Sequence, residues 1–280
     1  FGLNFSHLRL HFLNLLHHSL HIEIHLSSKV FSFARKFTKI NIHKKLKREN
    51  ITFAHSSNEF FGLMITKYGL NTFLTSVGFS ILLIIGSFFI HNGWIKYPIL
   101  IAGIAFLIFN FVFFRDPDRN PPSAKNVILS PADGEVVILK NTFEKRFIND
   151  EATQLSIFMS PLNVHVNRIP IDGTVDYLNY VKGDYLVAFH EKADLRNERS
   201  EIGINSKFGK VLFTQVAGFV ARRIVYEIKI GDTVKAGNRF GMIKFGSRSD
   251  VVVPKDWKVK VKIGDKVTAG ETILFEKINE

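Results

Sequence analysis

Two long apolar runs, separated by a short polar break, constrain this chain more than any other feature. Residues 73–90 (FLTSVGFSILLIIGSFFI) carry no charge, and residues 99–114 (ILIAGIAFLIFNFVFF) are interrupted only by Asn110. As a helix rising about 1.5 Å per residue, the first run would be about 27 Å long, close to the thickness of a bilayer core. A buried hairpin in a soluble domain would show an amphipathic face, which neither run has. The sequence therefore predicts an α-helical membrane hairpin, with Pro98 starting its second helix.

Basic residues lie at both outer ends of this hairpin. Lys67 precedes the first run, and Arg115 and Arg119 follow the second, although the break between the runs also holds Lys96. Cytoplasmic loops of membrane proteins carry an excess of Lys and Arg. We therefore expect a hairpin over residues 64–116 in the cell inner membrane, with the domain that follows on the cytoplasmic side.

The segment before the hairpin, residues 1–63, has a composition of its own. It contains no proline and eight of the eleven histidines, and the first methionine is Met64. The histidine positions fit no closed metal-ligand pattern, so we predict no metal site. We expect this segment to be a leader outside the fold, either disordered or upstream sequence translated in frame.

The net charge and the lack of cysteine limit the chemistry further. The chain carries a formal charge of +12 and has no cysteine, which excludes disulfides, thiolate nucleophiles and Cys-ligated metals. A basic balance suits anionic lipid or nucleic acid. Because no aromatic-basic recognition motif is present, we expect a lipid partner and no nucleic acid.

Short alternating runs rich in Val and Ile dominate the chain beyond residue 116. Such runs predict strands, here at residues 135–139, 155–159, 164–169, 211–216, 223–229, 250–253 and 258–263. A repeat, IKIGDTVKAG at 228–237 and VKIGDKVTAG at 261–270, places a Gly-Asp turn between strands in both copies. Repeats of this kind are typical of barrel-like sandwiches such as biotinyl or lipoyl carriers, but the lysine hairpin of those carriers is missing. The sequence predicts a mostly β, barrel-sandwich-like catalytic domain over residues 117–280.

Six motifs in order carry a family resemblance over most of residues 113–254. They are FFRDPDRNPP, SPADGEV, FMSPLNVHVNRIPIDGTV, NERSEIGI, QVAGFVARRIV and GNRFGMIKFGSR. Together with the preceding hairpin they resemble the short bacterial and archaeal form of phosphatidylserine decarboxylase, a self-cleaving proenzyme. The resemblance implies cleavage of the Gly246–Ser247 bond and conversion of Ser247 to a covalent pyruvoyl group.

A pyruvoyl group makes chemical sense for a decarboxylase. The carbanion left by CO₂ needs an electron sink, and no signature of a pyridoxal phosphate site is present. The pyruvoyl would form a Schiff base with the substrate amine and so convert phosphatidylserine to phosphatidylethanolamine. Gly246 offers an unhindered carbonyl to the Ser247 hydroxyl, and the cleaved α and β chains are expected to stay associated.

The resemblance also implies roles for two further residues. His165, in a matching SP-x-x-x-H pattern, would act as the base for Ser247, since its pKa suits proton transfer near neutrality. Asp133, in SPADG, would orient the histidine by a hydrogen bond. A half-buried strand histidine and an ordinary Asp-Gly turn are the simpler readings of these two residues.

Arginines supply the candidate contacts for an anionic headgroup. Arg168 stands where longer family members have a second histidine, which leaves the proton donor to the carbanion open and makes Arg168 a candidate for substrate phosphate or carboxylate. Arg222, Arg223 and Arg248 are further candidates, although exposed arginines are more often solvated or paired.

Three alternatives remain open from the sequence. The substrate could be a related serine ether lipid, and the enzyme could be a soluble pyruvoyl amino-acid decarboxylase, which the hairpin disfavours. The chain could instead be a membrane-tethered barrel-sandwich adaptor without activity. The sequence allows a homo-oligomer in each case.

Overall fold

The structure is a computed structural model that describes residues 65–124, 126–183, 197–218, 223–244 and 247–278. The expected leader, residues 1–63, lies outside the described residues.

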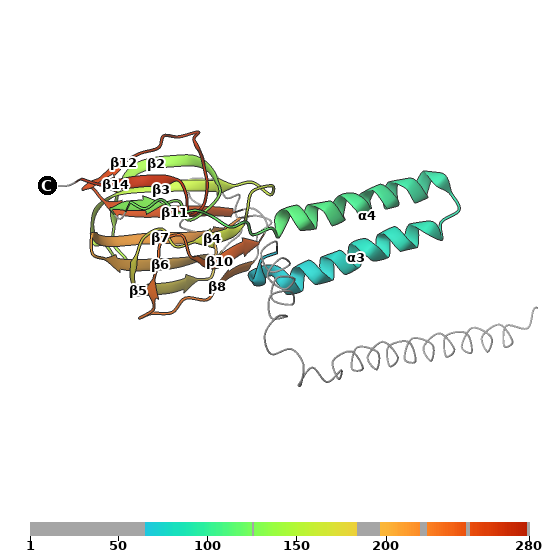
Figure 1. The fold of residues 1–280 in the computed structure, drawn as a ribbon, viewed down its shortest axis with the longest axis horizontal. Helices are drawn as coiled ribbons and strands as arrows, with labels where there is room; N and C mark the ends of the chain where they lie inside the picture. Colours follow the sequence, from blue (N-terminus) through green and yellow to red (C-terminus); the bar gives the residue numbers. More distant parts are fainter. Residues whose placement is uncertain (1–64, 125, 184–196, 219–222, 245–246, 279–280) are drawn as a thin grey trace, which may run out of the picture. The chain divides into compact units, whose positions relative to one another are not determined.

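The two apolar runs form a pair of antiparallel helices (Figure 1). A short 3-10 helix, η1 (Lys67–Gly69), leads into α3 (Leu70–Phe88), and α4 (Gly93–Phe113) returns. The prediction that Pro98 starts the second helix is wrong, because α4 begins at Gly93 and contains Pro98. Asn92 caps that helix by accepting a hydrogen bond from the Trp94 backbone N–H at 3.0 Å, and this cap moves the helix start upstream.

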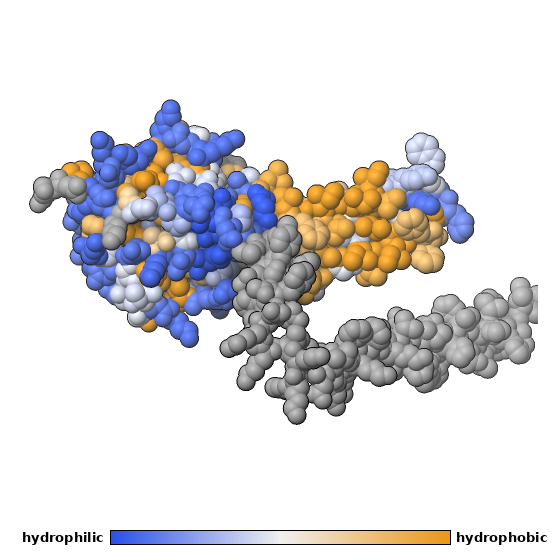
Figure 2. Space-filling view, viewed as in Figure 1, coloured by the Kyte–Doolittle hydropathy of each residue, from blue (hydrophilic) through white to orange (hydrophobic). Residues whose placement is uncertain are grey.

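The outer surface of the helix pair is apolar, whereas polar side chains lie between the helices. Both helices are long and apolar enough to cross a membrane, and Figure 2 shows a nearly continuous hydrophobic surface along them. Between them, Ser76 donates to the Asn110 side-chain oxygen at 2.6 Å, and Asn110 donates to the Phe106 carbonyl at 2.8 Å. Large exposed apolar surface marks an interaction site, and here it indicates membrane association.

Strands joined by turns and loops make up the rest of the described chain, as the sequence predicted, and all of their pairings are antiparallel. An eight-stranded sheet has the order β13-β2-β3-β11-β7-β6-β5-β9, and two three-stranded sheets have the orders β1-β14-β12 and β4-β10-β8. The strand bounds are β1 (Val127–Leu129), β2 (Gly134–Glu144), β3 (Asp150–Met159), β4 (Val166–Arg168), β5 (Gly173–Val181), β6 (Arg199–Ser206), β7 (Gly209–Ala217), β8 (Arg223–Tyr226), β9 (Thr233–Val234), β10 (Arg239–Lys244), β11 (Ser247–Pro254), β12 (Trp257–Val259), β13 (Lys266–Val267) and β14 (Ile273–Lys277). The curled sheets enclose a core that includes Leu155, Ile157, Phe213 and Val251.

The Gly-Asp repeat forms the same turn twice. Gly231 and Gly264 both have φ near 90°, a region that glycine enters without strain. In each copy the aspartate side chain accepts a backbone hydrogen bond from the residue three positions earlier, at 2.8 Å for Asp232 and 2.9 Å for Asp265. The repeat therefore specifies two equivalent corners of the β domain.

A second apolar cluster joins the hairpin to the β4-β10-β8 sheet. It lies at the end of the hairpin where α3 begins and α4 ends, called here the foot of the hairpin. Phe73, Phe113 and Phe114 of the hairpin segment pack with Val166 and Met242 of this sheet. This packing fixes the ends of the apolar helices beside β10, the strand that leads into the predicted cleavage site.

Candidate active site

The predicted cleavage site lies between two strands of different sheets. β10 ends at Lys244 and β11 begins at Ser247, while Phe245 and Gly246 lie outside the described residues. The backbone of Ser247 pairs with Met159 of β3 on one side and with Ala217 of β7 on the other. Ser247 therefore opens a central strand that is held from both sides.

His165 is buried beside β10, directly before β4. Its carbonyl accepts a hydrogen bond from the Ile243 backbone N–H at 3.3 Å, and its ring centroid lies 4.3 Å from that of Phe113. His165 Nδ1 lies 2.9 Å from the carbonyl oxygen of Asn163. A carbonyl only accepts, so Nδ1 carries the proton and Nε2 the lone pair. Nε2 is buried and has no hydrogen-bond partner among the described residues.

The environment keeps His165 neutral. Burial is the main reason that the pKa of His165 falls from 6.5 to about 4; the Asn163 hydrogen bond opposes this, and the charge of Arg115 adds to it. The expectation of a pKa near neutrality is therefore wrong for this buried histidine, but the imidazole is neutral at pH 7 and can accept a proton without first losing one. A neutral imidazole with an unpaired, buried lone pair has the properties of a general base.

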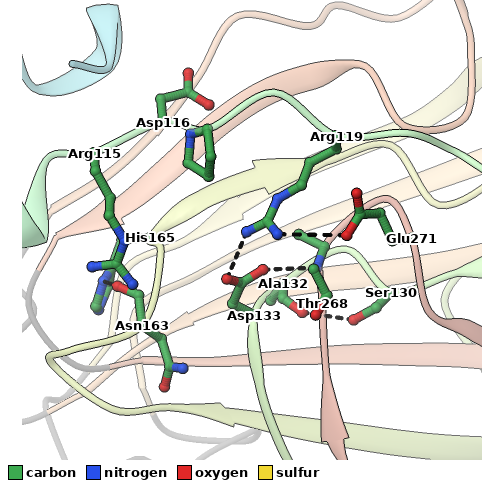
Figure 3. Close-up of polar contacts among 12 residues, drawn as sticks. Arg115, Asp116, Arg119, Ser130, Ala132, Asp133, Asn163, His165, Thr268 and Glu271 are labelled. Atoms are coloured by element: carbon green, nitrogen blue, oxygen red, sulfur yellow. Dashed lines mark hydrogen bonds and ion pairs between the residues drawn. The ribbon is translucent and has the colours of Figure 1, made fainter. Parts of the chain in front are cut away.

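The Asp133 carboxylate accepts hydrogen bonds from groups other than His165 (Figure 3). Its Oδ2 accepts a hydrogen bond from Arg119 Nη2 at 2.8 Å, and its Oδ1 accepts one from the Ala269 backbone N–H at 2.8 Å. Arg119 also lies 3.6 Å from the Glu271 carboxylate. The hydrogen bond expected between Asp133 and His165 is not among the contacts of the described residues. A main-chain carbonyl, that of Asn163, orients the imidazole instead.

One of the two hydrogen bonds of Asp133 recurs in the other half of the β domain. Asp172, which like Asp133 precedes the glycine that opens a strand, accepts from the Ala236 backbone N–H at 2.7 Å. Ala236 and Ala269 hold the same position in the Gly-Asp repeat. The Asp133–Ala269 bond therefore belongs to the internal symmetry of the fold. Within the described residues, only Asp133 of this pair adds an ion pair with an arginine.

Arg168 is buried and forms hydrogen bonds with the segment that follows the membrane hairpin, at Asp116 and Pro117. Its Nη1 donates to the Gly237 carbonyl and its Nη2 to the Pro117 carbonyl, both at 2.9 Å, with Asp116 at 3.4 Å. The guanidinium thus has protein acceptors on both sides. These partners come from segments far apart in the sequence, so nothing in the local pattern could have predicted them.

Arg248 is likewise an interior residue, although it directly follows Ser247. It is fully buried, and its Nε and Nη2 lie 2.8 Å and 3.0 Å from the two carboxylate oxygens of Asp250. This ion pair, with one hydrogen bond from Nη2, compensates the charge of the guanidinium within the sheet. Arg168 and Arg248 thus both contact groups of the protein itself, where the sequence had suggested a substrate headgroup.

A cavity of about 560 Å³ opens beside β8, lined by Tyr180, Glu198, Arg223 and residues 224–226. The Tyr180 hydroxyl donates to the Glu198 carboxylate, and the Glu198 carbonyl accepts from the Ala217 backbone N–H at 2.8 Å. Because Ala217 pairs with Ser247, this wall lies within two strand spacings, about 10 Å, of the reactive position. Of the predicted anion contacts, Arg223 lines the cavity and Arg222 lies outside the described residues. No sequence pattern pointed to Tyr180, which comes from β5, a strand distant in the sequence.

Comparison with known proteins decides the family. A family model described as phosphatidylserine decarboxylase matches residues 106–275. The phosphatidylserine decarboxylase proenzyme of Chlorobium phaeobacteroides (strain BS1) is 45% identical over 75% of this chain and 98% of its own length. Proteins of the same name from Chlorobium phaeovibrioides and Chlorobaculum tepidum are 48% and 50% identical, over 75% and 62% of this chain and 95% and 80% of their own lengths. The chain belongs to the phosphatidylserine decarboxylase family.

Membership in the phosphatidylserine decarboxylase family confirms the resemblance drawn from the six motifs. The chain is a lyase of phospholipid biosynthesis, made as a proenzyme, that converts phosphatidylserine to phosphatidylethanolamine with a pyruvoyl group. The buried lone pair of His165, beside the strand that leads into Gly246–Ser247, fits the chemistry by which a chain makes such a group from its own serine.

Proposed function

We propose that this phosphatidylserine decarboxylase makes its pyruvoyl group from Ser247, and that His165 is the base that starts the conversion. The main observation behind this assignment is the buried Nε2 of His165, which has no hydrogen-bond partner among the described residues. Its backbone bonds Ile243 in β10, and β10 leads within three residues to the reactive bond. A base is required because a serine hydroxyl is a weak nucleophile.

The proposed self-cleavage begins as His165 takes the hydroxyl proton of Ser247 and the oxygen attacks the Gly246 carbonyl carbon. The peptide C–N bond breaks as the C–O bond forms, and the nitrogen takes up the proton, so the peptide becomes an ester. Removal of the Ser247 α-proton expels the Gly246 carboxylate and leaves dehydroalanine. Its imine tautomer takes up water and releases ammonia, leaving a pyruvoyl group at the head of residues 247–280.

The strand arrangement supports continued association of the two products. In the α chain, β11 is paired on both edges, with β3 and with β7, and β14 lies between β1 and β12, of which only β12 belongs to the same fragment. The cleaved bond lies in the two-residue link between β10 and β11, so its loss breaks neither strand pairing. We therefore propose that both chains remain one folded unit.

The pyruvoyl group, once formed, supplies an electron sink for the carbanion left by CO₂. Formed from Ser247, that group would stand at the first position of β11, whose backbone pairs with Met159 and Ala217. The buried Nε2 of His165 can take up the proton that the substrate ammonium loses as the Schiff base forms, and can return it to the product. Asp133 enters the proposal as a positioning residue, acting through Arg119 rather than by contact with His165.

Residues where the hairpin meets the β domain support a location of this chemistry at a membrane surface. Leu162, in the loop between β3 and β4, is 66% exposed, and its carbonyl accepts from Arg115, just beyond α4, at 2.8 Å. Lys67 and Arg115 lie at the same end of the hairpin, which favours the cytoplasmic face of the inner membrane. We propose a hairpin at 64–116 that anchors a catalytic domain at 117–280, so that phosphatidylserine need not leave the bilayer.

The test is Ser247→Ala, with Ser249→Ala as the matched control. Ser249 lies on the same strand and is buried, with its hydroxyl donating to the Thr214 carbonyl at 2.9 Å. In vesicles containing phosphatidylserine, the wild type and Ser249→Ala should cleave and release CO₂, and Ser247→Ala should do neither. Cleavage of Ser247→Ala, or CO₂ release from it, would overturn the assignment.

A further inference from the structure

Lys244 is a buried cation at the foot of the membrane hairpin that the reaction scheme above does not use. It is the last residue of β10, three positions before Ser247, and its side chain is only 8% exposed. Its Nζ donates to the Thr72 hydroxyl in the first turn of α3 at 3.0 Å. Lysine is rarely buried without an acidic partner, and the described residues provide none within ion-pair distance of Lys244.

Arg223 adds a second positive charge at the same place. It stands directly opposite Lys244 in the pairing of β8 with β10, where side chains of a cross-strand pair lie on the same face of the sheet. Burial, and secondarily the charge of Arg223, lowers the pKa of Lys244 below its ordinary value. Two cations side by side repel each other, so the arrangement favours an anion that would bridge them.

The pair lies at the level where a lipid headgroup would stand. Thr72 directly precedes Phe73, the first residue of the uncharged run 73–90. Lysine side chains at such a boundary extend toward the phosphates of the interface. Arg223 also lines the cavity that holds Glu198, so the pair lies between the membrane boundary and that cavity.

We infer that Lys244 and Arg223 form the subsite for the phosphodiester of the phospholipid substrate. This inference rests on the proposed function, because it assumes that the serine amine reacts at residue 247. The Cα atoms of Lys244 and Ser247 can be at most about 11 Å apart. In phosphatidylserine only two carbons separate the phosphate ester oxygen from the amine, so one headgroup can span the two positions. The subsite selects a phospholipid over free serine.

The experiment compares two substrates that differ in the phosphate. One is phosphatidylserine in mixed micelles, and the other is a long-chain O-alkyl serine, which keeps the amine and the carboxylate. A charge-assisted hydrogen bond contributes about 1.5–3 kcal/mol, or roughly 10- to 150-fold. Lys244→Met should therefore raise KM for phosphatidylserine at least about tenfold and change kcat/KM for O-alkyl serine less than about twofold, and Lys244→Arg should recover most of the loss.

Two controls make each outcome decisive. Lys262→Met removes an exposed lysine from a Gly-Asp turn and should leave both substrates unaffected. Arg223→Met, at an exposed position, should reproduce the selective loss even where Lys244→Met disturbs self-cleavage. Equal losses for both substrates, or no loss in Arg223→Met, would overturn the subsite. A wild type that is cleaved but releases no CO₂ from phosphatidylserine would instead refute the proposed function.

Discussion

The pH dependence of self-cleavage tests the role of His165 quantitatively. The proenzyme can be made by cell-free synthesis with vesicles and diluted into buffers between about pH 8 and about pH 4, and the two products can be followed on denaturing gels. Burial holds the pKa of His165 at about 4, against 6.5 in water. At pH 5.5 about 97% of such an imidazole is neutral, whereas an ordinary histidine would be only about 10% neutral.

The cleavage rate at pH 5.5 should therefore nearly equal the rate at pH 7, and it should fall tenfold per pH unit only below about pH 4. A rate that halves near pH 6.5 would refute the assignment of this buried imidazole as the base. Circular dichroism at each pH provides the control that the β domain stays folded.

The same pKa predicts how acid affects stability. Below pH 6.5 the histidine of the unfolded chain binds a proton that the native residue does not, so the free energy of unfolding decreases as the pH falls. The loss grows until about pH 4, where it reaches roughly 3 kcal/mol. Urea titrations of Ser247→Ala should show this dependence, and His165→Phe in the same background should remove most of it.

Three further predictions concern the residues around the site. Asp133→Ala and Asp172→Ala should each lose about 1 kcal/mol of stability from the shared turn bond, with a further loss in Asp133→Ala from its ion pair with Arg119, while only Asp133→Ala should slow self-cleavage; equal cleavage rates would make Asp133 purely structural. Arg168→Met should lower the free energy of unfolding by about 3 kcal/mol in urea titrations, because the carbonyls of Gly237 and Pro117 lose their donor, and a raised KM with unchanged stability would instead make Arg168 a substrate ligand. The cleaved chains should co-elute in size-exclusion chromatography and separate only in denaturant; separation under native conditions would contradict the shared sheets.

Patterns that repeat locally were sufficient to predict much of the fold. The uncharged runs specified the hairpin, and alternation of Val and Ile located strands such as β3, β7 and β11. The Gly-Asp repeat located the short strands β9 and β13, which have two residues each, but no local signal shows that they pair with β5 and β2. The helix start at Gly93 was missed because one capping residue, Asn92, outweighed the preference of Pro98.

The candidate site likewise divides into residues that the sequence could predict and contacts that it could not. Motifs were sufficient to select Ser247 and His165 as the candidates, because both are chemically distinctive at their positions. The partners of these residues depend on the tertiary fold. Asn163 orients His165 through its main-chain carbonyl, which any residue could supply, and Arg168 is satisfied by Gly237 and Pro117. A sequence shows which side chains are available but not which of them the fold has already paired.

The most direct test of the account is the mass of the purified protein under denaturing conditions. We expect two pieces, with the smaller one comprising the 34 residues 247–280 and carrying a pyruvoyl group in place of Ser247, so that its N-terminus is blocked to Edman chemistry. A single intact chain in a preparation that releases CO₂ from phosphatidylserine, or a small piece that begins with an unmodified serine, would contradict it.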